Sequence, residues 1–227
     1  METKLKIRTG AQTDLNHFYK MAALLSLITI CYNLVEGIVS VFFGAEGSAV
    51  SLLGFGIDSF VEVISAVGVW HMVLRMKRNV KLNGAGETDR FERTALRITG
   101  GAFYLLTLGL AAASAVNIYE GNKPKTAFMG IIISSLSILG MWALIHYKVK
   151  IGRQYNSRAL LADAACSKTC LYLSFVLLAA SLGYELTGVG IIDSVGALGI
   201  AAFAFKEGRE AFDKAKGKEC GCGGACK

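Results

Sequence analysis

The chain has 227 residues, of which 53% are hydrophobic, and it carries a formal net charge of +7. Soluble domains are about 45–50% apolar, and here the apolar residues are gathered in long blocks, which excludes an ordinary soluble domain. The basic residues lie between these blocks, so membrane topology explains the charge and a nucleic-acid partner is not expected. Residues 1–20 are polar and lack the apolar core of a cleavable signal peptide.

Six apolar stretches follow one another along the chain and predict six membrane-spanning helices. Each has about 17–27 residues, which suits a hydrocarbon layer of about 30 Å, and helices satisfy their own backbone groups in lipid. The stretches are residues 21–43, 48–74, 96–118, 127–147, 159–182 and 189–205. The sequence therefore predicts an all-α integral membrane protein with a six-transmembrane-helix bundle. Its parts are a cytoplasmic N-terminal segment (1–20), the transmembrane domain (21–206) and a Cys-rich cytoplasmic tail (207–227).

Charge differs between successive loops and predicts the topology. Of the 24 Lys and Arg residues, 21 lie in or at the edge of the N-terminal segment, the loops after the second and fourth stretches, and the tail, with Lys148 in the loop after the fourth stretch. Positively charged loops stay in the cytoplasm, so both termini are predicted to be cytoplasmic. The loops after the first, third and fifth stretches are short, which predicts that spans 1–2, 3–4 and 5–6 are antiparallel neighbours.

The first two stretches carry polar residues at positions within the membrane. In the first, Asn33 and Glu36 either line a cation pathway or form hydrogen bonds between helices, and the sequence leaves both open. In the second, Asp58 and Glu62 are four residues apart and share one helix face. Two carboxylates in the membrane are costly unless they are paired, protonated or bound to a cation. The pair therefore indicates an ion site more strongly than two structural acids bonded to other helices.

The fifth stretch begins with "LLADAACSKTC" (160–170), which places Asp163, Cys166 and Cys170 on one stripe of the helix. Buried free cysteines are often small core residues. The four-residue spacing of this pair, however, matches that of the two acids in the second stretch at similar depth. Lys168 lies well round the helix from the stripe, so we expect it to extend toward the cytoplasm or to pair with an acid.

Two carboxylates and two thiols together predict a metal site between the second and fifth spans. The ligands would be Asp58, Glu62, Cys166 and Cys170, with Asp163 as an additional ligand or a supporting group. Four such ligands suit zinc, and thiolates shift the preference toward softer ions such as cadmium, mercury or cuprous copper. Because these ligands must lose protons to bind a metal, metal binding and proton release are coupled. This coupling is the chemical basis of metal/proton exchange.

The sixth stretch and the tail carry the remaining candidates. Asp193 lies near the outer surface, where we expect a helix cap or an interfacial group. In the tail, Cys220, Cys222 and Cys226 are predicted to be free thiols in a reducing cytosol. They form either a flexible capture site for a soft metal or a terminus with incidental cysteines.

These motifs resemble the membrane domain of the cation diffusion facilitator family of divalent-metal/proton antiporters. The family's second span typically carries two ligands four residues apart, and "GFGIDSFVE" places Asp58 and Glu62 there. Its fifth span reads like SxALxADAxHxxxD, and "SRALLADAACSKTC" (157–170) keeps the ADA while Cys166 and Cys170 replace the usual His and Asp. "IIDSVGALGIA" resembles the start of the family's sixth span without its proline. The resemblance covers roughly residues 20–210.

The resemblance implies a secondary transporter, not an enzyme, that exports zinc, cadmium or a similar cation by proton antiport. The transported metal ion is the substrate, and no permanently bound cofactor is expected. The implied partners are the metal cation, protons, the lipid bilayer and a second copy of the chain. The implied location is the inner (cytoplasmic) membrane of a prokaryote. Family members commonly carry a cytoplasmic C-terminal domain, for which the tail is too short, so a homodimer would rest on the membrane helices.

Two other functions stay open from the sequence. A non-transporting metal receptor or scaffold would bind metal at the tail and move nothing across the membrane. A membrane thiol oxidoreductase would use Cys166 and Cys170 or the tail thiols and would act without metal. The spacing of those two cysteines is C-x3-C, whereas the common redox spacing is C-x2-C, which disfavours this alternative.

Overall fold

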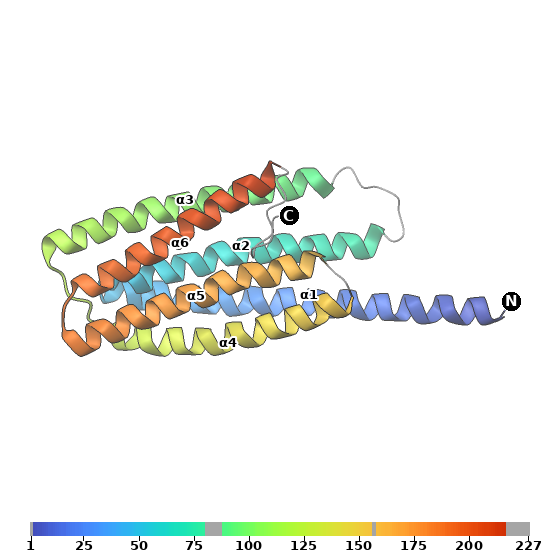
Figure 1. Ribbon diagram of the computed structural model, residues 1–227, viewed down its shortest axis with the longest axis horizontal. Helices are drawn as coiled ribbons and strands as arrows, with labels where there is room; N and C mark the ends of the chain where they lie inside the picture. Colours follow the sequence, from blue (N-terminus) through green and yellow to red (C-terminus); the bar gives the residue numbers. More distant parts are fainter. Residues whose placement is uncertain (1, 80–87, 156–157, 217–227) are drawn as a thin grey trace.

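The computed structural model describes residues 2–79, 88–155 and 158–216, and within them the chain forms six α-helices and no β-strand. The helices lie side by side with their long axes roughly parallel, and α1 projects beyond the others at its N-terminal end (Figure 1). The predicted all-α fold class is confirmed. The helices are α1 (Glu2–Glu46), α2 (Val50–Asn79), α3 (Thr88–Glu120), α4 (Ala127–Gln154), α5 (Arg158–Thr187) and α6 (Ile191–Ala215).

The two ends of the bundle follow from the directions of the helices. Helices α1, α3 and α5 begin at one end, and α2, α4 and α6 finish there (Figure 1). We predict from the loop charges that this end faces the cytoplasm, and we name it the basic end; the opposite end is the outer end. Each predicted span falls on one helix to within two residues, but α6 continues to Ala215, past the boundary predicted after residue 206.

The surface of the bundle is that of a membrane protein. Helices α1 to α5 each contain a segment long and apolar enough to cross a membrane. Helix α6 has 25 residues, which at about 1.5 Å per residue also exceeds the hydrocarbon thickness, although it carries more charge. Large apolar side chains lie on the outside, where Leu105 is 73% exposed and Leu139 is 67% exposed. So extensive an apolar surface is favourable in lipid and not in water, and the chain is a multi-pass integral membrane protein.

The main helix pairs are not all those that the short loops predicted. Within the described ranges, α1 packs mainly against α2, α3 against α6 and α4 against α5. The predicted contact of spans 1 and 2 is confirmed, and spans 5 and 6 also touch, but the predicted pairing of spans 3 and 4 is wrong.

The reason lies in the connection from α3 to α4, which crosses the outer end. There the Lys125 N–H donates to the Gly47 carbonyl at 2.8 Å, and Thr126 Oγ1 donates to the Phe43 carbonyl at 2.8 Å. These bonds fasten the start of α4 to the α1–α2 turn. Helix α4 therefore begins beside α1, and α3 packs against α6 instead.

Two glycines let α2 lie close to its neighbours. A Cβ atom at Gly54 would lie 2.5 Å from the Leu110 side chain of α3, and one at Gly56 would lie 2.7 Å from the Val41 backbone nitrogen of α1. Small residues allow such close approach of membrane helices. They hold α2 between α1 and α3, and the side chain of Asp58, two residues further on, contacts α5.

The predicted cap residue Asp193 joins α6 to α2 at the outer end. Its carboxylate accepts hydrogen bonds from the Val50 N–H at 2.7 Å, from the Ser51 N–H at 3.3 Å and from the Ser51 hydroxyl. The N–H groups in the first turn of a helix lack partners within the helix, and a carboxylate satisfies them well. Asp193 is thus a helix cap, as predicted, but it caps α2 and not its own helix.

Candidate functional site

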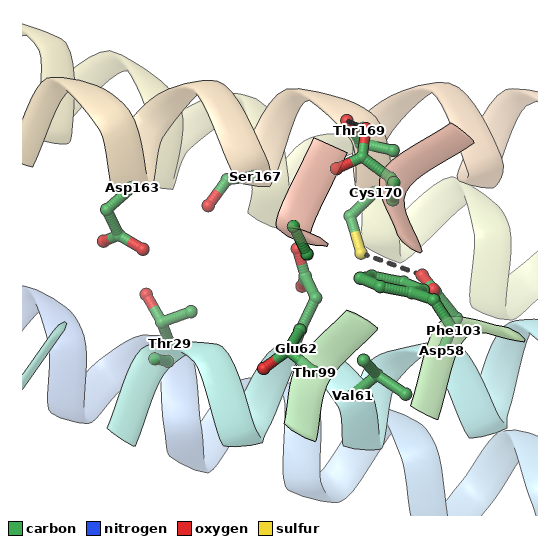
Figure 2. Close-up of a pocket in the computed structure, with 13 residues that line it drawn as sticks. Thr29, Asp58, Val61, Glu62, Thr99, Phe103, Asp163, Ser167, Thr169 and Cys170 are labelled. Atoms are coloured by element: carbon green, nitrogen blue, oxygen red, sulfur yellow. Dashed lines mark hydrogen bonds between the residues drawn. The ribbon is translucent and has the colours of Figure 1, made fainter. Parts of the chain in front are cut away.

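A cavity of about 60 Å³ lies within the bundle and is lined by side chains from every helix except α4. Two polar walls face each other across it, one from α2 and one from α5 (Figure 2). Four of the five metal-site candidates, two from α2 and two from α5, line this one cavity. The candidates are Asp58, Glu62, Asp163 and Cys170, and the other polar lining residues are Thr29, Thr99, Ser167, Thr169 and Glu207.

Asp58 and Cys170 contact each other across the site. Both are buried, at 2% and 1% exposure, and the Cys170 thiol donates a hydrogen bond to Asp58 Oδ2 with a sulfur–oxygen distance of 3.5 Å (Figure 2). Asp58 Oδ1 has no hydrogen-bond partner. Zinc–sulfur bonds of about 2.3 Å and zinc–oxygen bonds of about 2.0 Å, meeting at a tetrahedral angle, place sulfur and oxygen about 3.5 Å apart. The two side chains are therefore spaced as two ligands of one metal ion would be.

Glu62 lies one helical turn from Asp58 toward the basic end. The Asn33 side-chain amide of α1 donates a hydrogen bond to Glu62 Oε2 at 2.6 Å. Asn33 is fully buried, and its amide oxygen has no hydrogen-bond partner. The sequence left two roles open for Asn33, and the structure contains one of them, a hydrogen bond between helices. The acceptor of this bond, Glu62, is a candidate metal ligand. Asn33 therefore fixes the orientation of that carboxylate.

Glu36 is buried outside the cavity lining, between α1, α2 and α4. Ser59 Oγ donates to Glu36 Oε2 at 3.2 Å, and Tyr32 OH lies 3.2 Å from Glu36 Oε1 and 3.3 Å from the Leu136 carbonyl. The carboxylate is thus held by neighbouring hydroxyl groups. It also belongs to a network that links three helices.

Asp163 forms an ion pair that sequence reasoning missed. Its Oδ2 lies 2.9 Å from Nζ of Lys148 on α4, and the same ammonium donates to Ser167 Oγ at 2.9 Å. Lys148 is fully buried, at 0% exposure, so counting it with the cytoplasmic loop was wrong. A signal existed: Lys148 falls on the stripe of α4 that includes Ser137, Met141 and Leu144, all of them buried.

Glu207 is a second lining residue that the sequence did not single out. It belongs to α6, and its Oε1 accepts a hydrogen bond from Thr169 Oγ1 of α5 at 2.9 Å. Because the sixth span was predicted to end before it, this acid was assigned to the tail. The end of an apolar run marks where a helix leaves lipid and not where the helix stops.

The other candidates lie away from the cavity or beyond the described side chains. Cys166 is on α5 one turn from Cys170, but its side chain lies outside the described ones, as do the tail residues Cys220, Cys222 and Cys226. Lys168 is exposed and does not line the cavity. Among the described residues, no three His, Cys, Asp or Glu side chains form a cluster able to hold a metal ion. Of the predicted ligands, Asp58, Glu62, Asp163 and Cys170 are described, and Asp58 and Cys170 are hydrogen-bonded to each other across the two helices.

Comparisons with known proteins identify similar proteins of one kind, membrane transporters. The family model of the cation efflux transmembrane domain matches residues 22–216 of this chain. The chain is also similar to an uncharacterized transporter of Methanocaldococcus jannaschii, with 25% identity over 183 residues. That match covers 79% of this chain and 64% of the relative, so the chain spans less than two thirds of the length of the curated relative it matches. The matched range of the family model includes every residue that lines the cavity.

Proposed function

The chain belongs to the cation efflux family, and we propose that it is a secondary transporter that exports zinc, cadmium or a similar soft divalent cation in exchange for protons. Family membership supports cation transport, and the printed name of the archaeal relative, a transporter, agrees with it. The choice of metal rests on the chemistry of the cavity. Carboxylates with one or two thiols favour zinc and softer ions over magnesium or calcium, which prefer oxygen ligands alone.

The observation that carries the proposal is the 3.5 Å separation of Cys170 Sγ and Asp58 Oδ2, both buried and both at the cavity. We assign Asp58, Glu62, Cys166 and Cys170 as the ligands of the transported ion. Helices α2 and α5 run in opposite directions, so one turn toward the basic end leads from Asp58 to Glu62 and from Cys170 to Cys166. A metal held by the Asp58–Cys170 pair has its two other ligands on the same two helices.

The proposed exchange of metal for protons follows from the protonation of these ligands before a metal ion binds. The Cys170 thiol holds a proton that it donates to Asp58, and a metal ion binds the thiolate only after that proton leaves. Each metal ion that enters therefore releases protons, and protons that return from the outer side expel the metal. Rocking of helix pairs would expose the cavity alternately to the two sides.

The remaining parts of the proposal concern the setting of the protein. We place it in the inner membrane of a prokaryote as a homodimer. The thiols of Cys220, Cys222 and Cys226 would capture soft metal ions at the cytoplasmic side. The metal is substrate, and no resident cofactor takes part.

The decisive experiment is metal flux in reconstituted vesicles that carry a pH gradient, with zinc, cadmium and mercury as test ions and a pH-sensitive dye inside. We expect metal movement coupled to proton movement in the wild-type chain, and loss of both in Asp58→Ala and in the double variant Cys166→Ser/Cys170→Ser. Cys31→Ser is the matched control, because Cys31 is an exposed thiol. Flux retained in the double variant would move the site toward α2 alone. Absence of flux for every ion in the wild type would contradict the transporter and favour a metal receptor.

A further inference from the structure

Lys148 places a positive charge beside a cavity that we propose receives cations. The residue reaches this position from α4, the one helix that contributes no side chain to the cavity lining. Its ammonium contacts Asp163 Oδ2 and Ser167 Oγ, both at 2.9 Å, and both of these residues line the cavity. In Figure 2 Asp163 and Ser167 lie next to each other on α5, away from the Cys170–Asp58 contact.

Neither charge of the pair is stable alone at this depth. The side chains of Lys148 and Asp163 are 0% and 5% exposed, and an unpaired buried charge of either sign is strongly unfavourable. Pairing cancels the two charges locally and fixes the Asp163 carboxylate toward α4. A carboxylate whose oxygen is already ion-paired with an ammonium is a poor ligand for a metal ion, because the two cations compete for it.

We propose that Lys148 is a specificity-determining residue that acts as a tethered cation. By neutralising Asp163, it limits the negative charge available in the cavity and confines the metal ion to the ligands around Asp58 and Cys170. This inference rests on the proposed transport function and refines it, since it gives Asp163, an additional candidate ligand from the sequence, the role of a partner for Lys148. A direct ligand role for Asp163 and a purely mechanical role for the pair are the two competing explanations, and each predicts a different mutant pattern.

The test measures cadmium binding to the purified full-length chain by calorimetry, for Lys148→Met, Asp163→Asn and the double variant. Lys148→Met releases the Asp163 charge, so cadmium should bind more tightly, on the order of tenfold for one added unit charge near the ion. Asp163→Asn leaves the ammonium uncompensated, so binding should weaken on the order of tenfold for the same reason. In the double variant both charges are absent, and affinity should return to near the wild-type value.

Opposite shifts that cancel in the double variant support the tethered cation. A double variant that binds as weakly as Asp163→Asn would show that Asp163 is a ligand and would overturn the inference. If both single variants weaken binding to the same extent, the pair only holds α4 and α5 together. That result would also overturn the inference. Lys150→Met is the matched control, because it removes the same charge from an exposed position two residues away on α4; its affinity should not change.

Two further measurements keep the outcome clear. Size-exclusion profiles and unfolding temperatures without metal show whether each variant is folded. If a single variant unfolds, the affinity of the charge-neutral double variant alone shows whether Asp163 is a metal ligand or the counter-ion of Lys148. Vesicle flux of the wild type separates the two proposals. No flux contradicts the proposed function even where the binding shifts cancel, whereas flux without cancelling shifts contradicts only the role of Lys148.

Discussion

Asp58 and Asp193 are both aspartates buried in the same bundle, at 2% and 3% exposure, yet their surroundings differ in kind. Asp193 accepts two backbone N–H groups and one hydroxyl group at the start of α2. Asp58 accepts one bond from a thiol, a weak donor, and its second oxygen has no hydrogen-bond partner. The Asp193 carboxylate accepts hydrogen bonds at both oxygens, whereas the Asp58 carboxylate has one oxygen without a partner beside a cavity.

The difference separates a structural acid from a candidate ligand. Buried polar groups are almost always hydrogen-bonded, so an exception requires a specific explanation. For Asp58 the explanation that we propose is a cation that completes its coordination. For Asp193 no ligand is needed, because the helix end supplies its partners. The following substitutions test this division, from the largest expected effect to the smallest.

Asp58→Asn should reduce metal flux by about 100-fold or more, because loss of a direct ligand costs more than the 10–100-fold typical of groups that only support ligands. Asparagine keeps the size and one acceptor, so the unfolding temperature without metal should stay close to that of the wild type. Flux in vesicles and unfolding in detergent are the two measurements. Normal flux in this variant would make Asp58 a structural acid like Asp193.

Asp193→Asn should show the opposite pattern. The loss of charge-assisted hydrogen bonds to the start of α2 should lower the free energy of unfolding by about 2 kcal/mol, while folded protein should retain its affinity for cadmium. Denaturant titration in detergent and calorimetry measure the two quantities. A large loss of affinity with unchanged stability would remove the distinction between the two aspartates.

Cys170→Ser should change the relative affinity for cadmium and zinc and leave the fold intact. Replacing a thiolate by a hydroxyl should weaken cadmium binding by about tenfold or more relative to zinc, because cadmium is the softer ion. Competition between the two metals on the purified chain measures the ratio, and Cys31→Ser serves as the control. An unchanged ratio would mean that the thiol contacts Asp58 without touching the metal.

Ser51→Ala should have the smallest effect of the four. It removes the hydroxyl donor to Asp193 and leaves both N–H donors, so we expect a loss of about 1 kcal/mol of stability and no change in flux. The matched control is Ser135→Ala, whose hydroxyl is exposed and bonds only the Ile131 carbonyl of its own helix; this change should cost a few tenths of a kcal/mol or less. Equal losses in both variants would show that the Asp193 cap contributes little.

Much of the site was predictable because helix periodicity alone places residues on faces. The spacing of Asp58 and Glu62, and that of Asp163 and Cys170, put each pair on one stripe of one helix, and the structure brings these stripes to one cavity. Lys148 was not identified, since a lysine near the end of an apolar run normally extends to the interface. Its burial depends on Asp163 of α5, and no pattern within α4 alone identifies that partner.

The sequence by itself determined the number, order and direction of the membrane-spanning segments, because hydrocarbon thickness and backbone hydrogen bonding leave an apolar run few alternatives. It also determined which helix faces carry acids and thiols. Only the tertiary structure decided which helices touch: α3 packs on α6, and Asp193 caps α2. It also decided how each buried charge is satisfied, by a helix end for Asp193, by Lys148 for Asp163, and incompletely for Asp58. The physical reason is that contacts between helices join residues far apart in the chain, whereas periodicity describes each helix separately.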